Sequence, residues 1–113
     1  MKIVGTWEIA RDRENHSIWT FNSDGTLIGT NSKRSTIHGS YEEVGKNIYQ
    51  YSDMANVYDE NMKYDQIGRG AGKITITEDG NSIEFDGRIK YLSKDGILVN
   101  ERKIKCTGTK IIV

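Results

Sequence analysis

The sequence predicts an all-β protein, a small antiparallel meander β-barrel, with a β-sandwich of two sheets as the alternative. Apolar and polar residues alternate along most of the chain, which is typical of strands with one buried face. Asp-Gly pairs recur at short intervals, and glycine supplies the positive φ angle that tight hairpin turns need. A meander of this length must protect its edge strands, and closure into a barrel removes them.

The length of 113 residues suits one domain with one core. No linker, internal repeat or low-complexity tract divides the sequence. We therefore expect a single barrel domain over residues 1–113.

About ten strands are predicted from the alternating segments between the turn signals. The turn signals are Asp24-Gly25, Gly45-Lys46-Asn47, Asp79-Gly80, Asp86-Gly87 and Asp95-Gly96. The intervals between them are too short for crossover helices, so consecutive strands should be antiparallel neighbours. The predicted strands cover 2–10, 16–22, 26–31, 37–44, 47–52, 72–77, 82–86, 88–92, 97–105 and 109–113.

Residues 53–71 interrupt this rhythm. The segment carries apolar residues without clean alternation, and it fits a short helix, an irregular strand pair or a lid. Its last part, Gly68-Arg69-Gly70-Ala71-Gly72, superficially resembles a phosphate-binding loop. Because a strand rather than a helix is predicted to follow, we interpret this part as a flexible connector or a bulge.

The charges sum to zero, with 16 basic and 16 acidic residues. A general nucleic-acid binder or a polybasic membrane-surface protein is therefore not expected. The charges are nevertheless uneven, since residues 41–65 hold six acids against two bases and residues 88–113 hold seven bases against two acids. Two interpretations are open: the segments neutralise each other in the fold, or the second forms a basic patch for a small anion.

Cys106 is the only cysteine, so no intramolecular disulfide and no cysteine-rich zinc site is expected. The N-terminus lacks the basic and apolar regions of a signal peptide, and no apolar stretch is long enough for a transmembrane helix. The sequence as written predicts a cytoplasmic protein, or a secreted or periplasmic one if a signal peptide was removed.

Several short motifs follow one another in the N-terminal half. Gly5-Thr6-Trp7 opens the first strand, Trp19-Thr20-Phe21 leads into Asp24-Gly25-Thr26, and Gly39-Ser40-Tyr41 precedes a strand ending in Ile48-Tyr49-Gln50-Tyr51. Their order over residues 3–51 resembles the small bacterial lipocalin-like (calycin) domains. This resemblance implies a barrel that binds a small, partly apolar molecule. Typical lipocalins are longer, so the barrel here would be small or partly collapsed.

The resemblance also implies how the base of the barrel is closed. In lipocalins a Gly-x-Trp tryptophan fills the base, and an arginine from the last barrel strand lies across its ring. Here Gly5 and Trp7 match the motif. Arg102 is the expected partner, with Arg88 as the alternative. A guanidinium over an indole contributes about 0.5–2 kcal/mol, depending on desolvation.

Aromatic residues are the candidate ligand-binding side chains. Trp19, Tyr41, Tyr49 and Tyr51 would line the barrel, since tyrosine combines an apolar ring with a hydrogen-bonding tip. The alternative is ordinary cross-strand packing.

The expected function is non-catalytic binding of a small, partly apolar molecule. His38 and Ser40 share one face of a predicted strand, but about 6–7 Å of backbone separates them, too far for a nucleophile and its base. No enzyme activity, cofactor or metal site is predicted. The alternative function is an interaction or structural module on a collapsed barrel. Its terminal strand, Lys110 to Val113, would pair as an edge with a protein partner or in a homodimer.

Overall fold

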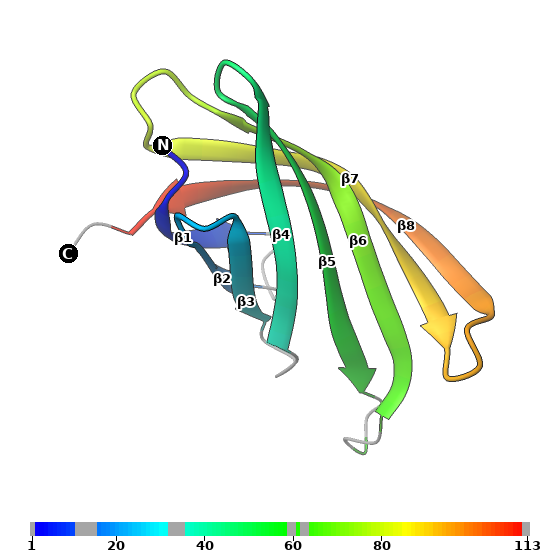
Figure 1. The fold of residues 1–113 in the computed structure, drawn as a ribbon. Helices are drawn as coiled ribbons and strands as arrows, with labels where there is room; N and C mark the ends of the chain where they lie inside the picture. The colour runs from blue at the N-terminus through cyan, green and yellow to red at the C-terminus, as the bar shows by residue number, and fades with distance from the viewer. Residues whose placement is uncertain (1, 11–15, 32–35, 59–60, 62–63, 112–113) are drawn as a thin grey trace.

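The computed structural model describes residues 2–10, 16–31, 36–58, 61 and 64–111. These residues form a closed antiparallel barrel in which every strand pairs with the next one along the chain (Figure 1). The predicted fold class is therefore confirmed, and the β-sandwich is not formed. The strands are β1 (Gly5–Ala10), β2 (His16–Phe21), β3 (Thr26–Asn31), β4 (Thr36–Gly45), β5 (Ile48–Tyr58), β6 (Tyr64–Ile76), β7 (Ser82–Ser93) and β8 (Leu98–Lys110).

The barrel closes between its first and last strands. Trp7 of β1 lies opposite Lys110 of β8, and the pairing runs on to Ala10 opposite Thr107. Beyond β8, the amide of Ile111 donates to the carbonyl of Thr6 at 2.9 Å. The prediction that Lys110 to Val113 forms a free edge is therefore wrong for Lys110 and Ile111, because these two residues close the barrel. Residues 112–113 lie outside the described residues.

The Asp86-Gly87 pair is not a turn, contrary to prediction. The segments 82–86 and 88–92 form one strand, β7, and Gly87 lies within it opposite Gly72 and Ile104. A Cβ atom at Gly87 would lie 2.5 Å from the carbonyl oxygen of Ala71, so glycine is needed here for close backbone approach rather than for a positive φ. Likewise, the segments 97–105 and 109–113 belong to one strand, β8, as far as Lys110.

The irregular segment 53–71 consists of strand extensions. Of its three interpretations, the strand pair holds, with β5 running on to Tyr58 and β6 starting at Tyr64. Gly68–Gly72 lies inside β6 and pairs without a register shift on both sides, so the interpretation as a flexible connector or a bulge is wrong. Tertiary pairing overrides the weak local pattern, because β6 bonds to a neighbour on each side along this stretch.

The other turn signals act as predicted. Gly25, Gly80 and Gly96 have φ angles of 89°, 75° and 82°, and Asn47 has a φ of 59°. Glycine and asparagine are the residues that tolerate this region of backbone space.

The strands differ in length, and this difference shapes the barrel. β1, β2 and β3 have 6 residues each, whereas β5 to β8 have 11 to 13. One end of the barrel is therefore enclosed on all sides, while at the other end β5–β8 run past the short strands (Figure 1). We call the first the closed end and the second the open end.

Candidate functional site

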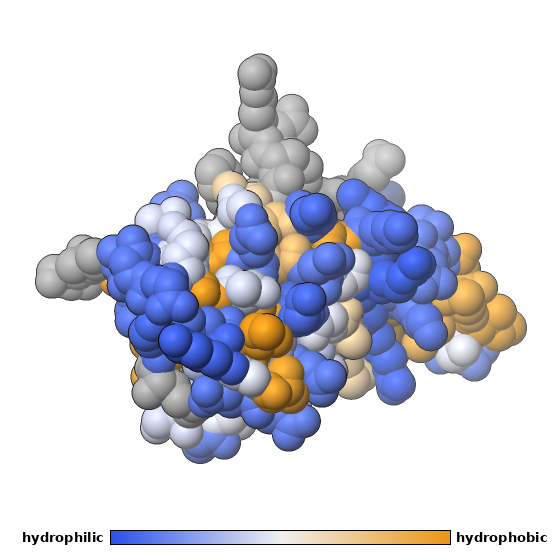
Figure 2. Space-filling view, turned by 90° about the horizontal axis from the view of Figure 1, so that it is seen from above, coloured by the Kyte–Doolittle hydropathy of each residue, from blue (hydrophilic) through white to orange (hydrophobic). Residues whose placement is uncertain are grey.

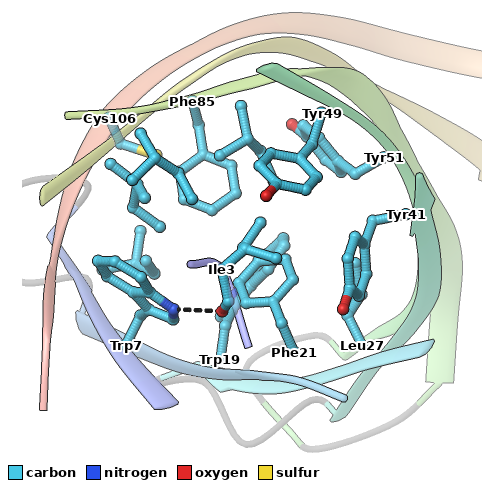
Figure 3. Packing of buried hydrophobic residues seen from close by; sticks show 14 of the residues in the cluster. Ile3, Trp7, Trp19, Phe21, Leu27, Tyr41, Tyr49, Tyr51, Phe85 and Cys106 are labelled. Carbon is cyan, nitrogen blue, oxygen red and sulfur yellow. Dashed lines mark hydrogen bonds between the residues drawn. The ribbon is translucent and has the colours of Figure 1, made fainter. Parts of the chain in front are cut away.

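At the closed end, Trp7 lies inside the barrel next to the N-terminal segment. Its side chain is fully buried, and its indole Nε1 donates to the carbonyl oxygen of Ile3 at 2.9 Å (Figure 3). Ile3 is also fully buried, and it fills the middle of the ring of core side chains. This end of the interior is occupied by the protein's own side chains.

The cation at the Trp7 ring is Lys110, which corrects the expectation of Arg102. Lys110 Nζ lies 5.6 Å from the ring centroid, and Lys110 is the register partner of Trp7. Arg102 is also on β8, but it precedes Cys106 and lies toward the open end, far from Trp7. It is opposite Ile89 and is exposed. The predicted alternative, Arg88, is exposed as well.

Gly5 stands where the motif predicts it, at the start of β1. Its φ is +133°, and a Cβ atom there would meet Lys110 Cε at 3.0 Å. Gly5 thus leaves the space through which the Lys110 side chain reaches Trp7. The Lys110 ammonium also donates to the carbonyl oxygen of Lys2 at 3.3 Å.

The four candidate ligand-binding residues all face the interior and belong to one buried cluster. Trp19 and Tyr51 lie in the middle of the barrel, each in edge contact with Phe85 at centroid distances of 5.1 and 5.5 Å. Tyr41 and Tyr49 lie 6.0 Å apart, and Tyr41 contacts Phe21 at 5.3 Å. The aromatic layer between the two ends is therefore packed ring against ring (Figure 3).

Burial perturbs the two outer tyrosines of this layer. Desolvation raises the pKa of Tyr41 above its usual 10.0, and the hydroxyl donates to the carbonyl oxygen of Asn22. Desolvation also raises the pKa of Tyr49, with a further contribution from the carboxylate of Glu43. Both hydroxyls therefore remain neutral donors over the physiological pH range.

Burial decreases along the interior toward the open end. On β7 the inward-facing residues change from fully buried Ile83 to half-buried Ile89 and Tyr91. On β5 buried Tyr51 is followed by the half-buried inward residues Asp53, Ala55 and Val57. The inward-facing side chains are thus more exposed at the open end than at the closed end.

Two polar groups at the inner edge of the open end have no hydrogen-bond partner in the described part of the chain. They are the Oγ of Ser17 and the indole Nε1 of Trp19, in residues that are 1% and 2% exposed. Both lie on the inward face of β2. Ser17 follows His16, the first residue of β2, which is opposite Ala10, the last residue of β1. A buried polar group without a partner costs about 1–3 kcal/mol, so both groups call for an acceptor that the described residues do not supply.

Sequence reasoning predicted Trp19 as an aromatic wall and missed Ser17. Ser17 alternates with Trp19 and Phe21, so its inward direction was readable from the pattern. The position of its hydroxyl depends on strand register, which places Ser17 opposite Ile9 of β1.

The His38–Ser40 pair lies elsewhere, on the outer face of β4. Both residues are exposed and point away from the aromatic layer. Within the described ranges, no group of three His, Cys, Asp or Glu residues is placed to hold a metal ion. Nor does any described segment form a helix long and apolar enough to cross a membrane.

No family model, curated protein or solved structure matches the chain. The protein is therefore classified by its own fold and buried residues. It is a closed eight-stranded antiparallel meander barrel with a buried aromatic cluster, and its inward-facing side chains become more exposed toward the open end.

Proposed function

We propose that the protein is a non-catalytic binder of a small, partly apolar molecule, held at the open end of the barrel. The observation that carries this proposal is the pair of buried, unpartnered polar groups on Ser17 and Trp19. Neither atom has accessible surface, so the side chains around them must move before a carbonyl or carboxylate oxygen of a ligand can accept from either. The lipocalin-like order of motifs over residues 3–51 supports the same function.

The neighbouring surface suits the rest of such a ligand. Half-buried Ala55, Ile89 and Ile104 offer apolar contact, and Tyr51 brings its hydroxyl close to the backbone of Gly87. A mostly apolar wall with a few convergent polar groups is typical of small-molecule sites. Tyr41 and Tyr49 then form the floor of the site rather than its wall, since they pack nearer the closed end.

Gly29 gives the Trp19 ring the space that it occupies against β3. A Cβ atom at Gly29 would lie 2.9 Å from Trp19 Nε1, so the indole N–H edge lies against the bare backbone of β3. Any side chain at this position would displace the ring.

Native mass spectrometry of protein purified gently from its own host tests the proposal. We expect an additional mass of about a few hundred daltons that is lost on denaturation. In Ser17→Ala the fraction of protein that carries the additional mass should decrease. The free energy of unfolding should be unchanged or higher, because the variant removes an unpaired buried hydroxyl. Ser82→Ala, at an exposed serine that begins β7 and lies outside the open end, is the matched control and should keep the ligand.

Two results would overturn the proposal. One is a bare monomer mass that stays bare after incubation with a small-molecule extract of the host. The other is equal ligand retention in Ser17→Ala, Trp19→Phe and the control variant.

A second candidate function is self-association through β8, and the β7–β8 hairpin favours it. Ile97, Leu98 and Val99 are 66%, 53% and 55% exposed at its tip. Figure 2 shows hydrophobic side chains gathered at the right-hand end, where Figure 1 places this hairpin. Among the described residues, pairing between β1 and β8 covers only Thr107 to Lys110, so the rest of β8 would present an edge to a second copy.

The charges on this edge fit a second copy of the same chain. An antiparallel pairing of two β8 strands centred on Arg102 places Glu101 of one copy opposite Lys103 of the other. Sedimentation velocity should then show a dimer that Glu101→Lys weakens and that the double variant Glu101→Lys/Lys103→Glu restores. A monomer at all concentrations would exclude this candidate.

A further inference from the structure

The outer face of the sheet carries a groove that the proposed function does not use. It has a volume of about 950 Å³ and runs across β4 to β8. Its lining includes four cationic side chains, Arg69, Arg88, Lys90 and Lys103. All four are exposed and alternate with inward-facing residues, so the groove lies on the opposite face of the sheet from the aromatic layer.

Strand register explains the shape of the groove. Ser40, Ser52 and Ala71 lie side by side on β4, β5 and β6, and they form a row of small side chains. On one side of this row stands a row of longer side chains that includes Met54 and Arg69. On the other side stands a second long row, made by Glu42, Gln50, Lys73 and Asp86.

The four cations are concentrated at one end of this groove. Arg88 continues the row of small residues onto β7 and lies opposite Lys103, while Arg69 lies opposite Lys90. Like charges directly opposite each other destabilise a sheet. The sequence could have avoided this cost at four solvent-facing positions, so the arrangement needs another reason.

Nearby carboxylates do not cancel the cations. Glu101 lies opposite Lys90 and contacts Arg88 at 3.4 Å, which accounts for one charge. Asp86 also lines the groove, but it stands between Lys73 and Lys105 as its register partners. The carboxylate of Asp53 would contact a Cβ atom at Gly70 at 2.7 Å, which places it on the interior side of the sheet.

We propose that this groove binds a phosphorylated small organic molecule. Arg69 and Arg88 hold the phosphate, because a guanidinium matches phosphate oxygens with two parallel N–H donors. Lys90 and Lys103 add charge on either side. The organic part of the ligand lies along Ser40, Ser52 and Ala71, where two hydroxyls offer hydrogen bonds and Met54 offers an apolar contact. The volume suits a small molecule.

The uneven charges left two interpretations open, namely that the two segments neutralise each other or that the second forms a basic patch for a small anion. The groove favours the basic patch. Arg88, Lys90 and Lys103 come from the basic segment 88–113, and Arg69 joins them from β6. The acidic segment lies mainly on β4 and β5, on the other side of β6 in the sheet. Glu42 and Glu43 on β4 stand two strands away from Arg69, and a ligand phosphate is the partner that we assign to these cations.

The test is a titration with inorganic pyrophosphate, followed by backbone amide shifts in NMR spectra at low salt. We expect saturable shifts at residues 69–71 and 88–90. Arg69→Gln and Lys90→Gln should each weaken binding about tenfold. Lys105→Gln is the matched control, since Lys105 is an exposed lysine on the same outer face but outside the groove; it should bind as the wild type does.

Further arms separate the possible ligands. Sulfate at equal ionic strength should bind at least tenfold more weakly than pyrophosphate, and Ser17→Ala should leave pyrophosphate binding unchanged. The proposal is wrong if no saturable shift occurs, if all three charge variants bind equally, or if sulfate binds as well as pyrophosphate. A single-stranded oligonucleotide that binds more tightly than pyrophosphate would replace the proposal with a nucleic-acid site.

Discussion

Lys110 lies over the ring of Trp7 at the closed end of the barrel, with 5.6 Å between Nζ and the ring centroid. The start of β1 and the end of β8 meet there, since Trp7 lies near the start of β1 and Lys110 ends β8. The contact therefore joins the two strands that close the barrel. A cation over an indole contributes about 0.5–2 kcal/mol, with the larger value for desolvated pairs.

This relationship predicts the effect of removing the charge. Lys110→Met keeps most of the side chain's length and should lower the free energy of unfolding by about 0.5–2 kcal/mol. Urea unfolding monitored by tryptophan fluorescence measures it. Arg102→Met is the control, and it should change stability by less than about 0.5 kcal/mol because Arg102 is exposed. The reverse order of the two effects would restore Arg102 as the closing residue.

Glycine within β7 supports a second prediction. Gly87→Ala would place a Cβ atom 2.5 Å from the Ala71 carbonyl oxygen and 2.6 Å from the Tyr51 hydroxyl. The resulting strain costs about 1–3 kcal/mol. This exceeds the gain of about 0.4–1 kcal/mol from a less flexible unfolded chain, so the variant should be less stable.

Gly45 provides the contrast. The nearest atoms to a Cβ atom there are 3.7 Å away, and its φ is not positive. Gly45→Ala should therefore stabilise the protein by about 0.4–1 kcal/mol. Thermal unfolding of both variants checks the pair, and an equal change in the two would contradict the role given to Gly87.

Two hairpin aspartates predict a loss of stability in acid. The Thr26 hydroxyl donates to Asp24, and the Thr77 hydroxyl donates to Asp79, so both carboxyl pKa values lie below the usual 3.8. Their contribution is present above pH 3.8 and is lost as pH falls through the lowered values. The difference in melting temperature between the wild type and Asp24→Asn/Asp79→Asn should shrink from pH 5 to pH 2. A constant difference would show that the carboxylates do not act through ionisation.

The raised pKa of Tyr49 predicts a loss of stability at alkaline pH. Its pKa is raised above 10.0 in the folded chain, so above pH 10 the unfolded state loses its proton first and folding becomes less favourable. The stability difference between pH 9 and pH 11 should be smaller in Tyr49→Phe than in the wild type. Urea titrations at the two pH values measure this. An identical decrease in both proteins would mean that Tyr49 ionises equally in both states.

The class of fold was predictable from local features of the sequence. Alternation shows which face of a strand is buried, and three Asp-Gly pairs adopt the positive φ angles that make hairpins. Even the candidate site was partly predictable, because Trp19, Tyr41, Tyr49 and Tyr51 share the parity of the core.

Other features depended on position along the strands, which alternation does not encode. Arg102 and Lys110 have the same parity, yet only Lys110 is level with Trp7. Asp86-Gly87 has the chemistry of a turn, but pairing with β6 and β8 makes it the middle of a strand.

By itself, the sequence determined an antiparallel all-β fold with an aromatic buried face, since hydrophobic period and turn chemistry are properties of neighbouring residues; the structure decided for the closed barrel over the sandwich. Only the tertiary structure decided which cation meets Trp7, which buried donors on β2 lack a partner, and which charges from β6, β7 and β8 gather in one groove. The physical reason is register. Each of these features joins residues far apart in the chain, and sliding one strand by two positions would keep every face correct and change every neighbour.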